Sequence, residues 1–600
     1  MRKTASAVTA AFTALALVAV PGTPAQAAPA TVSVDFTTAI AQLDASKYGL
    51  DITGYGSGNY ITGANAHTAN VRRQNFGTMR MELMFDETGR LVCGGDGCEK
   101  ALLDGDDWVA AIRALGAEPM LILPLGGTHA GAAQENLADA LAIYDHFAAT
   151  GAPVLKFVVG NETDNDGNPD KLDAPEYVAR FNAVYDALHA RNAAVEVGGP
   201  GLASYGTSDW EYAYMTTFLQ GSGTRTDFVD YHDYGAGYTP ATPEELVGPV
   251  ITEMGTDIAD LKARIAALVP SRPGGIPIQL GEWNMDYVDA EDRMVTHLAT
   301  VWGAAALGTI LENGASSLIY GDKNGNAGQN TGLGITSTEG EGPGGVNDPM
   351  PIYHGLGMFS GEGLFRGFGS TMVDTSSSDS LLRAFASTGS KNIVLVNGAT
   401  TATTTSLALT GYTAGSAAIW QSTGDTEANY APHRTGTLPI SGGAANITLP
   451  ARSVTTLVLA EQGLKGEYFT NTALTGTPAL TRVDPTVNFD WGMGTPGAPI
   501  GVDDFAVRWT GQVDAPAAAT YSFITTTDDG VRLWVDGQLL VDAWNDHSKR
   551  DDTGTIALTA GRHSIRMEFY EKGYDAIAQL AWSAPNLARQ AIPAGRLFPA

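Results

Sequence analysis

The chain has 600 residues, and 65 Asp and Glu against 35 Lys and Arg give it a formal net charge of −30 at pH 7. Such a charge repels phosphate backbones and anionic membrane surfaces, so neither nucleic acid nor a membrane is expected as a partner. A chain of this length exceeds a single domain and predicts several.

The N-terminus has the three parts of a secretory signal. The basic pair Arg2-Lys3 precedes an apolar stretch from about residue 5 to residue 20, and Pro21 and the string Ala25-Gln26-Ala27 follow it. The apolar run is shorter than a membrane-spanning helix and stops at the proline. We therefore expect residues 1–27 to be a signal peptide and the mature protein to be secreted and extracellular.

Two cysteines, Cys93 and Cys98, are separated by the flexible sequence Gly-Gly-Asp-Gly. An exported chain enters an oxidising compartment, so the pair predicts one local disulfide. A metal or redox site is the alternative, but two thiols with no nearby histidine make a poor metal site.

Short β-type runs alternate with helix-like segments between residues 47 and 322. The eight runs are 48–52, 79–85, 119–125, 155–160, 195–199, 228–232, 276–281 and 317–321. The helix-like segments, such as 107–115, 135–149, 174–190, 258–268 and 292–311, carry apolar residues at three- and four-residue spacing. Eight such units predict a (β/α)8 TIM barrel over residues 40–350, and a doubly wound sheet is the alternative.

After the barrel the pattern changes to short alternating strands separated by Gly, Ser, Thr and Asn. This pattern is typical of all-β structure and predicts a β-sandwich over residues 351–460, with the segment 353–365 still in the last barrel helix. A second all-β segment starts near residue 463 and runs to the C-terminus. The fold class is therefore multidomain, a TIM barrel followed by two β-sandwich modules.

Two glutamates each close an apolar run of the predicted barrel. Glu162 follows the fourth strand in Gly160-Asn161-Glu162, and Glu282 follows the seventh in Gly281-Glu282-Trp283-Asn284. Active sites of such barrels lie at the C-terminal ends of the strands. Retaining glycosidases need two carboxyls about 5–5.5 Å apart, one as nucleophile and the other as acid and then base. Glu162 and Glu282 are therefore the catalytic candidates.

Polar and aromatic side chains near these strand ends are candidates for contact with a sugar or with the carboxylates. Asn161 can hold a sugar hydroxyl, and Tyr231, His232 and Tyr234 can donate to a carboxylate. The substrate-binding candidates are Asn161, His232, Tyr234, Trp283 and Arg80. Two alternatives stay open: Trp283 is as suited to packing as to a sugar platform, and His232 can be a buried hydrogen-bonded histidine. For Asp51, Arg80, Glu82 and Asp322, bracing of the barrel is the favoured role, with Arg80 the best partner for a nucleophile carboxylate.

These motifs resemble a known clan. Asn-Glu after the fourth strand, His-x-Tyr after the sixth and Glu after the seventh resemble retaining (β/α)8 glycoside hydrolases. The segments 160–167 and 282–284 look most similar to arabinofuranosidases of family fifty-one and xylosidases of family thirty-nine. The resemblance implies Glu162 as acid/base, Glu282 as nucleophile and a β-sandwich after the barrel. The arabinofuranosidases have an acidic residue where Gly281 stands, and their Trp-x-Gly-Gly-Asn segment is replaced by Arg80-Met81-Glu82.

The C-terminal segment resembles the β-sandwich module named after the anthrax protective antigen. Its matching motifs are residues 463–468, 505–511, 527–537, 565–571 and 578–582. In the sugar-binding adhesins of that family an Asp-Asp pair holds calcium, and Asp528-Asp529 resembles that pair. The alternative is that the pair only shapes a turn; no other metal site is predicted.

The sequence as a whole predicts a secreted retaining glycoside hydrolase that cleaves a polysaccharide or oligosaccharide. The reaction needs no cofactor, and calcium is considered only for the C-terminal module. Two alternatives use the same features: a catalytically inactive glycan-binding or adhesion protein, and a transglycosylase in which a second sugar replaces water. The sugar, its linkage and the mode of cleavage are left open.

Overall fold

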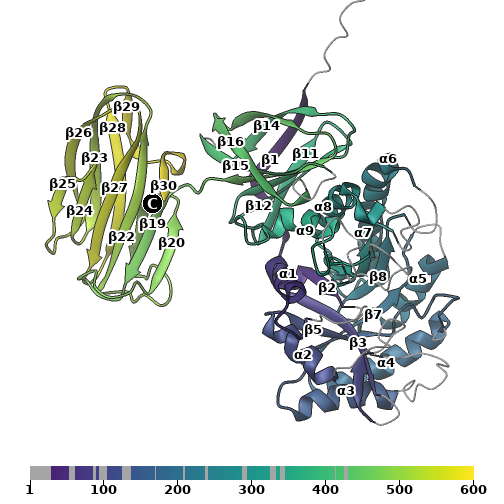
Figure 1. The fold of residues 1–600 in the computed structure, drawn as a ribbon. Coiled ribbons are helices and arrows are strands. Elements are labelled where there is room, and N and C mark those ends of the chain that lie inside the picture. Colours follow the sequence, from purple (N-terminus) through teal and green to yellow (C-terminus); the bar gives the residue numbers. More distant parts are fainter. Residues whose placement is uncertain are drawn as a thin grey trace, which may run out of the picture.

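The computed structural model describes residues 29–52, 61–85, 89–93, 104–123, 137–168, 171–206, 210–236, 241–286, 293–323, 333–337, 345–412, 414–424 and 430–599. The expected signal peptide and Cys98 lie outside these residues, so the signal and the disulfide stay predictions. Figure 1 shows three bodies along the chain: a barrel ringed by helices, a β domain beside it, and a separate C-terminal β domain.

The first body is a parallel barrel, as predicted. Its eight strands are hydrogen-bonded in the order β2-β10-β9-β8-β7-β6-β5-β3, and pairing of β2 with β3 closes the ring. The strands are β2 (Tyr48–Asp51), β3 (Thr78–Phe85), β5 (Glu118–Leu123), β6 (Lys156–Val159), β7 (Glu196–Leu202), β8 (Val229–Tyr234), β9 (Ile278–Asn284) and β10 (Ser316–Tyr320). The short β4 (Leu91–Cys93) pairs antiparallel with β3.

Helices cover the outside of the barrel. They are α1 (Ala66–Gln74), α2 (Gly105–Ala114), α3 (Leu137–Ala149), α4 (Ala174–Arg191), α5 (Trp210–Ser222), α6 (Pro243–Glu245), α7 (Ile251–Leu268), α8 (His297–Glu312) and α9 (Pro351–Ser360). None in the described part of the chain is long and apolar enough to cross a membrane.

Helix α8 is buried on nearly all sides because it lies between the barrel and the β domain. Fifteen of its residues, His297 to Leu311, are buried. A Cβ at Gly308 would come within 2.3 Å of the Phe385 ring of the β domain. On its other flank, Thr300 Oγ1 donates to the carbonyl of Pro351 at 2.7 Å. Helix α9 therefore packs with the barrel helices, as the segment 353–365 was expected to do.

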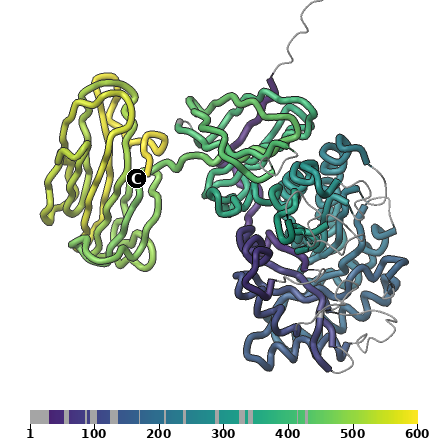
Figure 2. Tube along the Cα trace, in the orientation of Figure 1, coloured from purple at the N-terminus to yellow at the C-terminus, as the bar shows by residue number. Residues whose placement is uncertain are grey.

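The second body differs from a two-sheet sandwich. Its nine strands form a closed ring in the order β1-β11-β12-β13-β18-β15-β16-β17-β14. They are β1 (Ala30–Gln42), β11 (Thr371–Ser377), β12 (Leu382–Thr388), β13 (Asn392–Asn397), β14 (Thr403–Thr410), β15 (Ala414–Ser422), β16 (His433–Ser441), β17 (Ala444–Leu449) and β18 (Ser453–Leu459). The ring closes because β1 pairs with β11 on one side and with β14 on the other. Figure 2 shows this N-terminal strand, in purple, within the green C-terminal part of the domain.

The third body is a sandwich of two sheets. One sheet runs β20-β19-β22-β27-β24-β25, with β30 on β22, and the other runs β21-β28-β23-β26, with β29 on β28. The strands are β19 (Leu464–Phe469), β20 (Leu480–Asp484), β21 (Asn488–Gly492), β22 (Phe505–Ala515), β23 (Ala519–Asp528), β24 (Val531–Val535), β25 (Gln538–Ala543), β26 (Arg550–Leu558), β27 (Gly561–Glu571), β28 (Ala576–Ala584), β29 (Leu587–Ala591) and β30 (Leu597–Pro599). Its core is separate from that of the barrel.

Candidate active site

A bulge in β9 aims Glu282 into the barrel. Tyr231 of β8 pairs with Leu280, but the next residue, His232, pairs with Glu282, so Gly281 is an extra residue in β9. The pairing with β10 shows the same one-residue insertion. A bulge re-aims the side chains that follow it. Glu282 therefore points into the barrel, and Trp283 points outward.

Glu282 is the most firmly held carboxylate at the mouth. Its Oε1 accepts from Arg80 Nη1 at 2.7 Å, and its Oε2 accepts from the Tyr234 hydroxyl at 2.8 Å. Burial alone would raise the pKa of Glu282, but positive charge on His232 and Arg80 and these hydrogen bonds bring that pKa below its ordinary value. Glu282 is therefore ionised at neutral pH, as a nucleophile must be.

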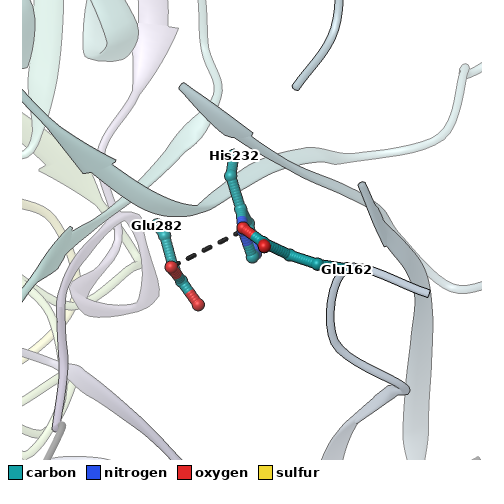
Figure 3. Close-up of side chains that lie close together, drawn as sticks. All are labelled: Glu162, His232 and Glu282. Carbon is teal, nitrogen blue, oxygen red and sulfur yellow. Dashed lines mark hydrogen bonds and ion pairs between the residues drawn. The ribbon is translucent and has the colours of Figure 1, made fainter. Parts of the chain in front are cut away.

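Glu162 comes from the end of β6 and faces Glu282 across His232 (Figure 3). Its backbone has a positive φ of 47°. The Nδ2 atom of Asn165 donates to its Oε2 at 3.2 Å. One carboxylate oxygen of each glutamate and a His232 nitrogen all lie within 4.8 Å of one another. These three groups have the spacing of metal ligands, but the guanidinium of Arg80 already holds Glu282 and would repel a cation.

His232 links the two carboxylates. Its Nδ1 lies 2.9 Å from Glu162 Oε1 and 3.6 Å from Glu282 Oε2. Burial lowers the pKa of His232, but the charge of Glu282 and the hydrogen bond to Glu162 raise it to about 9. Nδ1 therefore carries a proton toward Glu162 Oε1, and Arg80 Nη2 lies 3.3 Å from Nε2 on the other side of the ring.

Arg80 and two acids form the floor beneath the carboxylates. Arg80 Nη1 also contacts Asp51, and Nη2 donates to Asn161 Oδ1 at 2.5 Å. Asp230, two residues before His232 on β8, is fully buried and accepts from Gln279 Nε2 at 3.0 Å. A Cβ at Gly281 would lie 2.5 Å from Asp230 Oδ1. The Asp230 carboxylate therefore fills the space that a side chain at residue 281 would need.

The structure brings six predicted site residues together: Glu162, Glu282, Asn161, His232, Tyr234 and Arg80. Arg80 and His232 are both 0% exposed. Both contact the carboxylates, which is one of the roles predicted for each, and their burial leaves no surface for the sugar contact that was also predicted.

The prediction of Trp283 as a sugar platform is wrong. Its side chain is 0% exposed, its Nε1 donates to Ser317 Oγ at 2.9 Å, and its ring packs against Trp302. Tyr231 also points outward, toward Tyr205, and its hydroxyl has no partner, carboxylate or other, among the described residues. Both residues lie on the outer face of their strands, where the helices cover them.

The sequence did not indicate the roles of Asn165, Asp230 and Gly281 in the site. Asp230, His232 and Tyr234 have the two-residue spacing of one strand face, and this spacing could have placed Asp230 in the barrel. No sequence signal marks the bulge that makes Gly281 necessary.

A second acidic group lies in the C-terminal domain. Carboxylate oxygens of Asp528, Asp529 and Glu571 lie within 4.8 Å of one another. Burial, together with the charge of Asp529, raises the pKa of Glu571 to about 8. Glu571 Oε2 is buried and has no hydrogen-bond partner among the described residues. An all-oxygen set with an orphaned carboxylate oxygen fits calcium, and Glu571 adds a ligand that the sequence did not reveal.

Comparison with known proteins identifies the C-terminal domain. Residues 460–595 match the PA14 domain family. The anti-sigma-I factor RsgI3 of Acetivibrio thermocellus is 45% identical over 138 residues, which are 23% of this chain and 21% of that protein. The chain thus spans about a fifth of the length of this relative, and the likeness concerns the PA14 domain.

Solved structures of glycoside hydrolases share the fold of the rest of the chain. The GH51 α-L-arabinofuranosidase from Thermotoga petrophila has a TM-score of 0.56 at 15% identity, over 71% of this chain and 99% of that one. A GH44 xyloglucanase from Paenibacillus polymyxa has a TM-score of 0.52 at 16% identity, over 72% and 99%. The bifunctional glucanase-xylanase CelM2 from a metagenome library has a TM-score of 0.51 at 14% identity, over 72% and 99%. At these identities the likeness shows the fold alone.

Proposed function

We propose that this protein is a retaining glycoside hydrolase that cleaves O-glycosidic bonds in a polysaccharide or oligosaccharide. The observation that carries the proposal is that one carboxylate oxygen of Glu162 and one of Glu282 lie within 4.8 Å of each other, with Glu282 hydrogen-bonded to Arg80 and Tyr234. Oxygens this close suit the about 5–5.5 Å between the carboxyls of retaining enzymes better than the roughly 6.5–9.5 Å of inverting ones.

In the first step Glu282 attacks the anomeric carbon. Its carboxylate forms a bond to that carbon while the glycosidic C–O bond breaks, and Glu162 gives its proton to the leaving oxygen. The hydrogen bonds from Arg80 and Tyr234 keep the attacking carboxylate oriented. The product is a covalent glycosyl-enzyme and a free hydroxyl on the leaving group.

In the second step water replaces the leaving group. The glycosyl-enzyme no longer carries the negative charge of Glu282, so Glu162 can take a proton from water as the oxygen attacks the anomeric carbon. His232 Nδ1–H can donate to Glu162 Oε1 throughout, which suits a group that is ionised in one step and protonated in the other. Bond cleavage from Glu282 restores the resting enzyme.

The substrate is proposed from the fold neighbours and from the resemblance. Arabinofuranosidase, xyloglucanase and glucanase-xylanase structures are among the neighbours, so a plant-type polysaccharide or a fragment of one is the proposed substrate class. Arabinofuranosidase or xylosidase activity is the more specific proposal, and secretion follows from the predicted signal peptide. The PA14 domain is proposed to bind glycan, with calcium held by Asp528, Asp529 and Glu571.

The proposal is tested with aryl glycosides of arabinofuranose, xylose, glucose, galactose and glucuronic acid, and with polysaccharides. Glu282→Ala and Glu162→Ala should each abolish hydrolysis of the sugar that the wild type cleaves. Azide should rescue both variants, giving a glycosyl azide of inverted configuration with Glu282→Ala and of retained configuration with Glu162→Ala. NMR should show that the first anomer released by the wild type keeps the substrate configuration. Release of the opposite anomer would contradict the proposal.

The two alternatives give different results in the same experiment. A transglycosylase would transfer the sugar to an added acceptor in preference to water, with the same loss in both variants. An inactive glycan-binding protein would leave every substrate intact and still bind polysaccharide. A chain lacking residues 464–600 should keep its activity on aryl glycosides and lose polysaccharide affinity if the PA14 domain binds glycan.

A further inference from the structure

An exposed tryptophan stands beside the loop that carries Glu162. Trp210 is the first residue of α5, after the C-terminal end of β7, which places it at the mouth end of the barrel. Its side chain is 49% exposed, and it is the one tryptophan among the strongly exposed large apolar residues of the described chain. A large aromatic surface left in water at the mouth of a site is typical of ligand binding.

Two contacts tie Trp210 to the Glu162 loop. Lys171 Nζ lies 5.4 Å from the centroid of the indole. On another side the Trp210 ring packs edge to face with Tyr214, at 6.0 Å between centroids. The Tyr214 hydroxyl lies 3.3 Å from Thr163 Oγ1, and Thr163 directly follows Glu162. The exposed ring and the proposed acid/base therefore share one local framework.

The same loop is fixed internally. Asn168 Nδ2 donates to the carbonyls of Asn161 and Glu162, at 2.8 and 3.1 Å. Lys171 also forms an ion pair with Asp166, whose side chain is 88% exposed. The indole, which could stack on the apolar face of a sugar ring, thus has Lys171 beside it, and Lys171 in turn is paired with an exposed carboxylate.

We propose that Trp210, together with Lys171, binds a sugar unit of the leaving group. This inference rests on the proposed function, because Glu162 protonates the leaving oxygen and its flank therefore faces the leaving group. The ligand is a furanose or pyranose ring of an oligosaccharide or polysaccharide. Its apolar face would lie on the indole, and its hydroxyls would bond to Lys171 and Asp166.

The test compares two substrates that share one glycone. A glycosyl fluoride has no leaving-group sugar, whereas an oligosaccharide does. Trp210→Ala should lower kcat/KM for the oligosaccharide about tenfold or more and leave that for the fluoride within about twofold. Trp210→Phe should recover most of the loss, because it keeps an aromatic face. Leu364→Ala, which removes an exposed apolar side chain beyond the C-terminal end of α9, is the matched control and should change neither value.

Each other outcome overturns the inference. Equal losses on both substrates would assign Trp210 a structural role, and an unchanged oligosaccharide value would remove it from the binding site. If Trp210→Ala fails to fold, Trp210→Phe and Trp210→Leu are compared instead, by the ratio of kcat/KM for the oligosaccharide to that for the fluoride. Only the leucine variant should lose the preference for the oligosaccharide, and the same ratio in both variants would overturn the inference. A wild type that cleaves neither substrate would instead refute the proposed function, and the inference with it.

Discussion

At the scale of single residues, the proposed nucleophile depends on a glycine. The β9 bulge turns Glu282 into the barrel, and the Asp230 carboxylate occupies the space beside the extra residue. The arabinofuranosidases have an acidic residue before the nucleophile, whereas this chain has its buried acid on the neighbouring strand. Asp230 on β8 therefore adds to the negative charge that Asp51 places beside Arg80, and residue 281 is left without a side chain.

Gly281→Ala is predicted to cost most of the activity while the chain still folds. The added Cβ would lie 2.5 Å from Asp230 Oδ1, so the bulge or the acid must shift and Glu282 with it. A displacement of about 1 Å costs about 100-fold in rate. Kinetics on the aryl glycoside measure the loss, and Gly274→Ala, where no atom lies within 4 Å of the new Cβ, is the control. The double variant Gly281→Ala/Asp230→Ala should recover part of the activity that Gly281→Ala loses. If the losses of the two single variants simply add in the double variant, the steric explanation is refuted.

Asp164 is predicted to make stability depend on pH. It is fully buried, its Oδ1 accepts from the Ala203 amide at 3.0 Å, and its Oδ2 has no partner among the described residues. Burial raises the pKa of Asp164 to about 7. Between its ordinary pKa and that value the folded state holds a proton that the unfolded state has released, so stability falls as the pH rises through this window.

Asp164→Asn should remove this dependence, because an amide stays neutral and keeps the bond to Ala203. We compare the free energy of unfolding of Asp164→Asn with that of the wild type at each pH. The difference, variant minus wild type, should be larger at pH 8 than at pH 5 by about 1 kcal/mol or more. Calorimetry at both pH values measures it, and the transition of the PA14 domain is an internal control that should not change. An equal difference at the two pH values would mean that Asp164 is ionised throughout.

At the scale of elements, the strands of the barrel were predictable, and several β strands outside the barrel were not. All eight barrel strands match predicted runs because parallel strands buried on both faces form continuous apolar segments. Strands β1, β11 and β16 were missed because they are rich in Thr and Ser and exposed on one face. The pairing of β1 with strands about 340 residues later cannot be read from a local pattern.

For the site, the positions of the residues along the strands were predictable, but the directions of their side chains were not. Residues that close strands, such as Glu162 and Glu282, are placed at the barrel mouth by the topology, but the bulge in β9 aims Glu282 inward. The outward direction of Trp283 was not predictable, because it depends on an insertion of one residue in β9 that reverses the alternation of its side chains. Charge partners beneath the site depend on the packing of side chains from several strands.

Strand β1 is predicted to be necessary for the nine-stranded domain. Val32 and Val34 are 0% and 1% exposed in its core, and β1 closes the ring between β11 and β14. Val32→Ala and Val34→Ala should each destabilise the domain by about 1–3 kcal/mol, through lost apolar burial and the cavity left behind. Ser33→Ala, on the exposed face of the same strand, should change stability by less than about 0.5 kcal/mol. Chemical denaturation measures the three variants, and equal effects would place β1 outside the core.

At the scale of the whole molecule, the barrel and the nine-stranded domain pack together as one unit, and the PA14 domain is a second unit. Helix α8 is buried between the first two, and His297 Nε2 lies 2.9 Å from Ser422 Oγ of β15. The PA14 domain has its own core and follows a short connection near residues 460–463. The two units should therefore unfold in separate transitions. A ligand that binds the PA14 domain should change the Tm of that domain's transition alone.

Calcium is predicted to stabilise the PA14 domain alone. Asp528, Asp529 and Glu571 hold their oxygens within 4.8 Å of one another, and a divalent cation would remove their mutual repulsion. A cation that binds only the folded domain at 100 times its Kd adds about 2.7 kcal/mol to stability. Calcium should therefore raise the Tm of the PA14 transition by several degrees and leave that of the barrel unchanged, with magnesium less effective because it requires a stricter octahedral geometry. Without calcium, Asp528→Asn should raise the Tm because it removes a repelling charge, whereas Glu571→Gln should change the Tm little at neutral pH, where the Glu571 carboxyl with its raised pKa is protonated. Both variants should abolish the calcium shift. A shift retained in both variants would place the cation elsewhere, and no shift in the wild type would leave the acids as a turn.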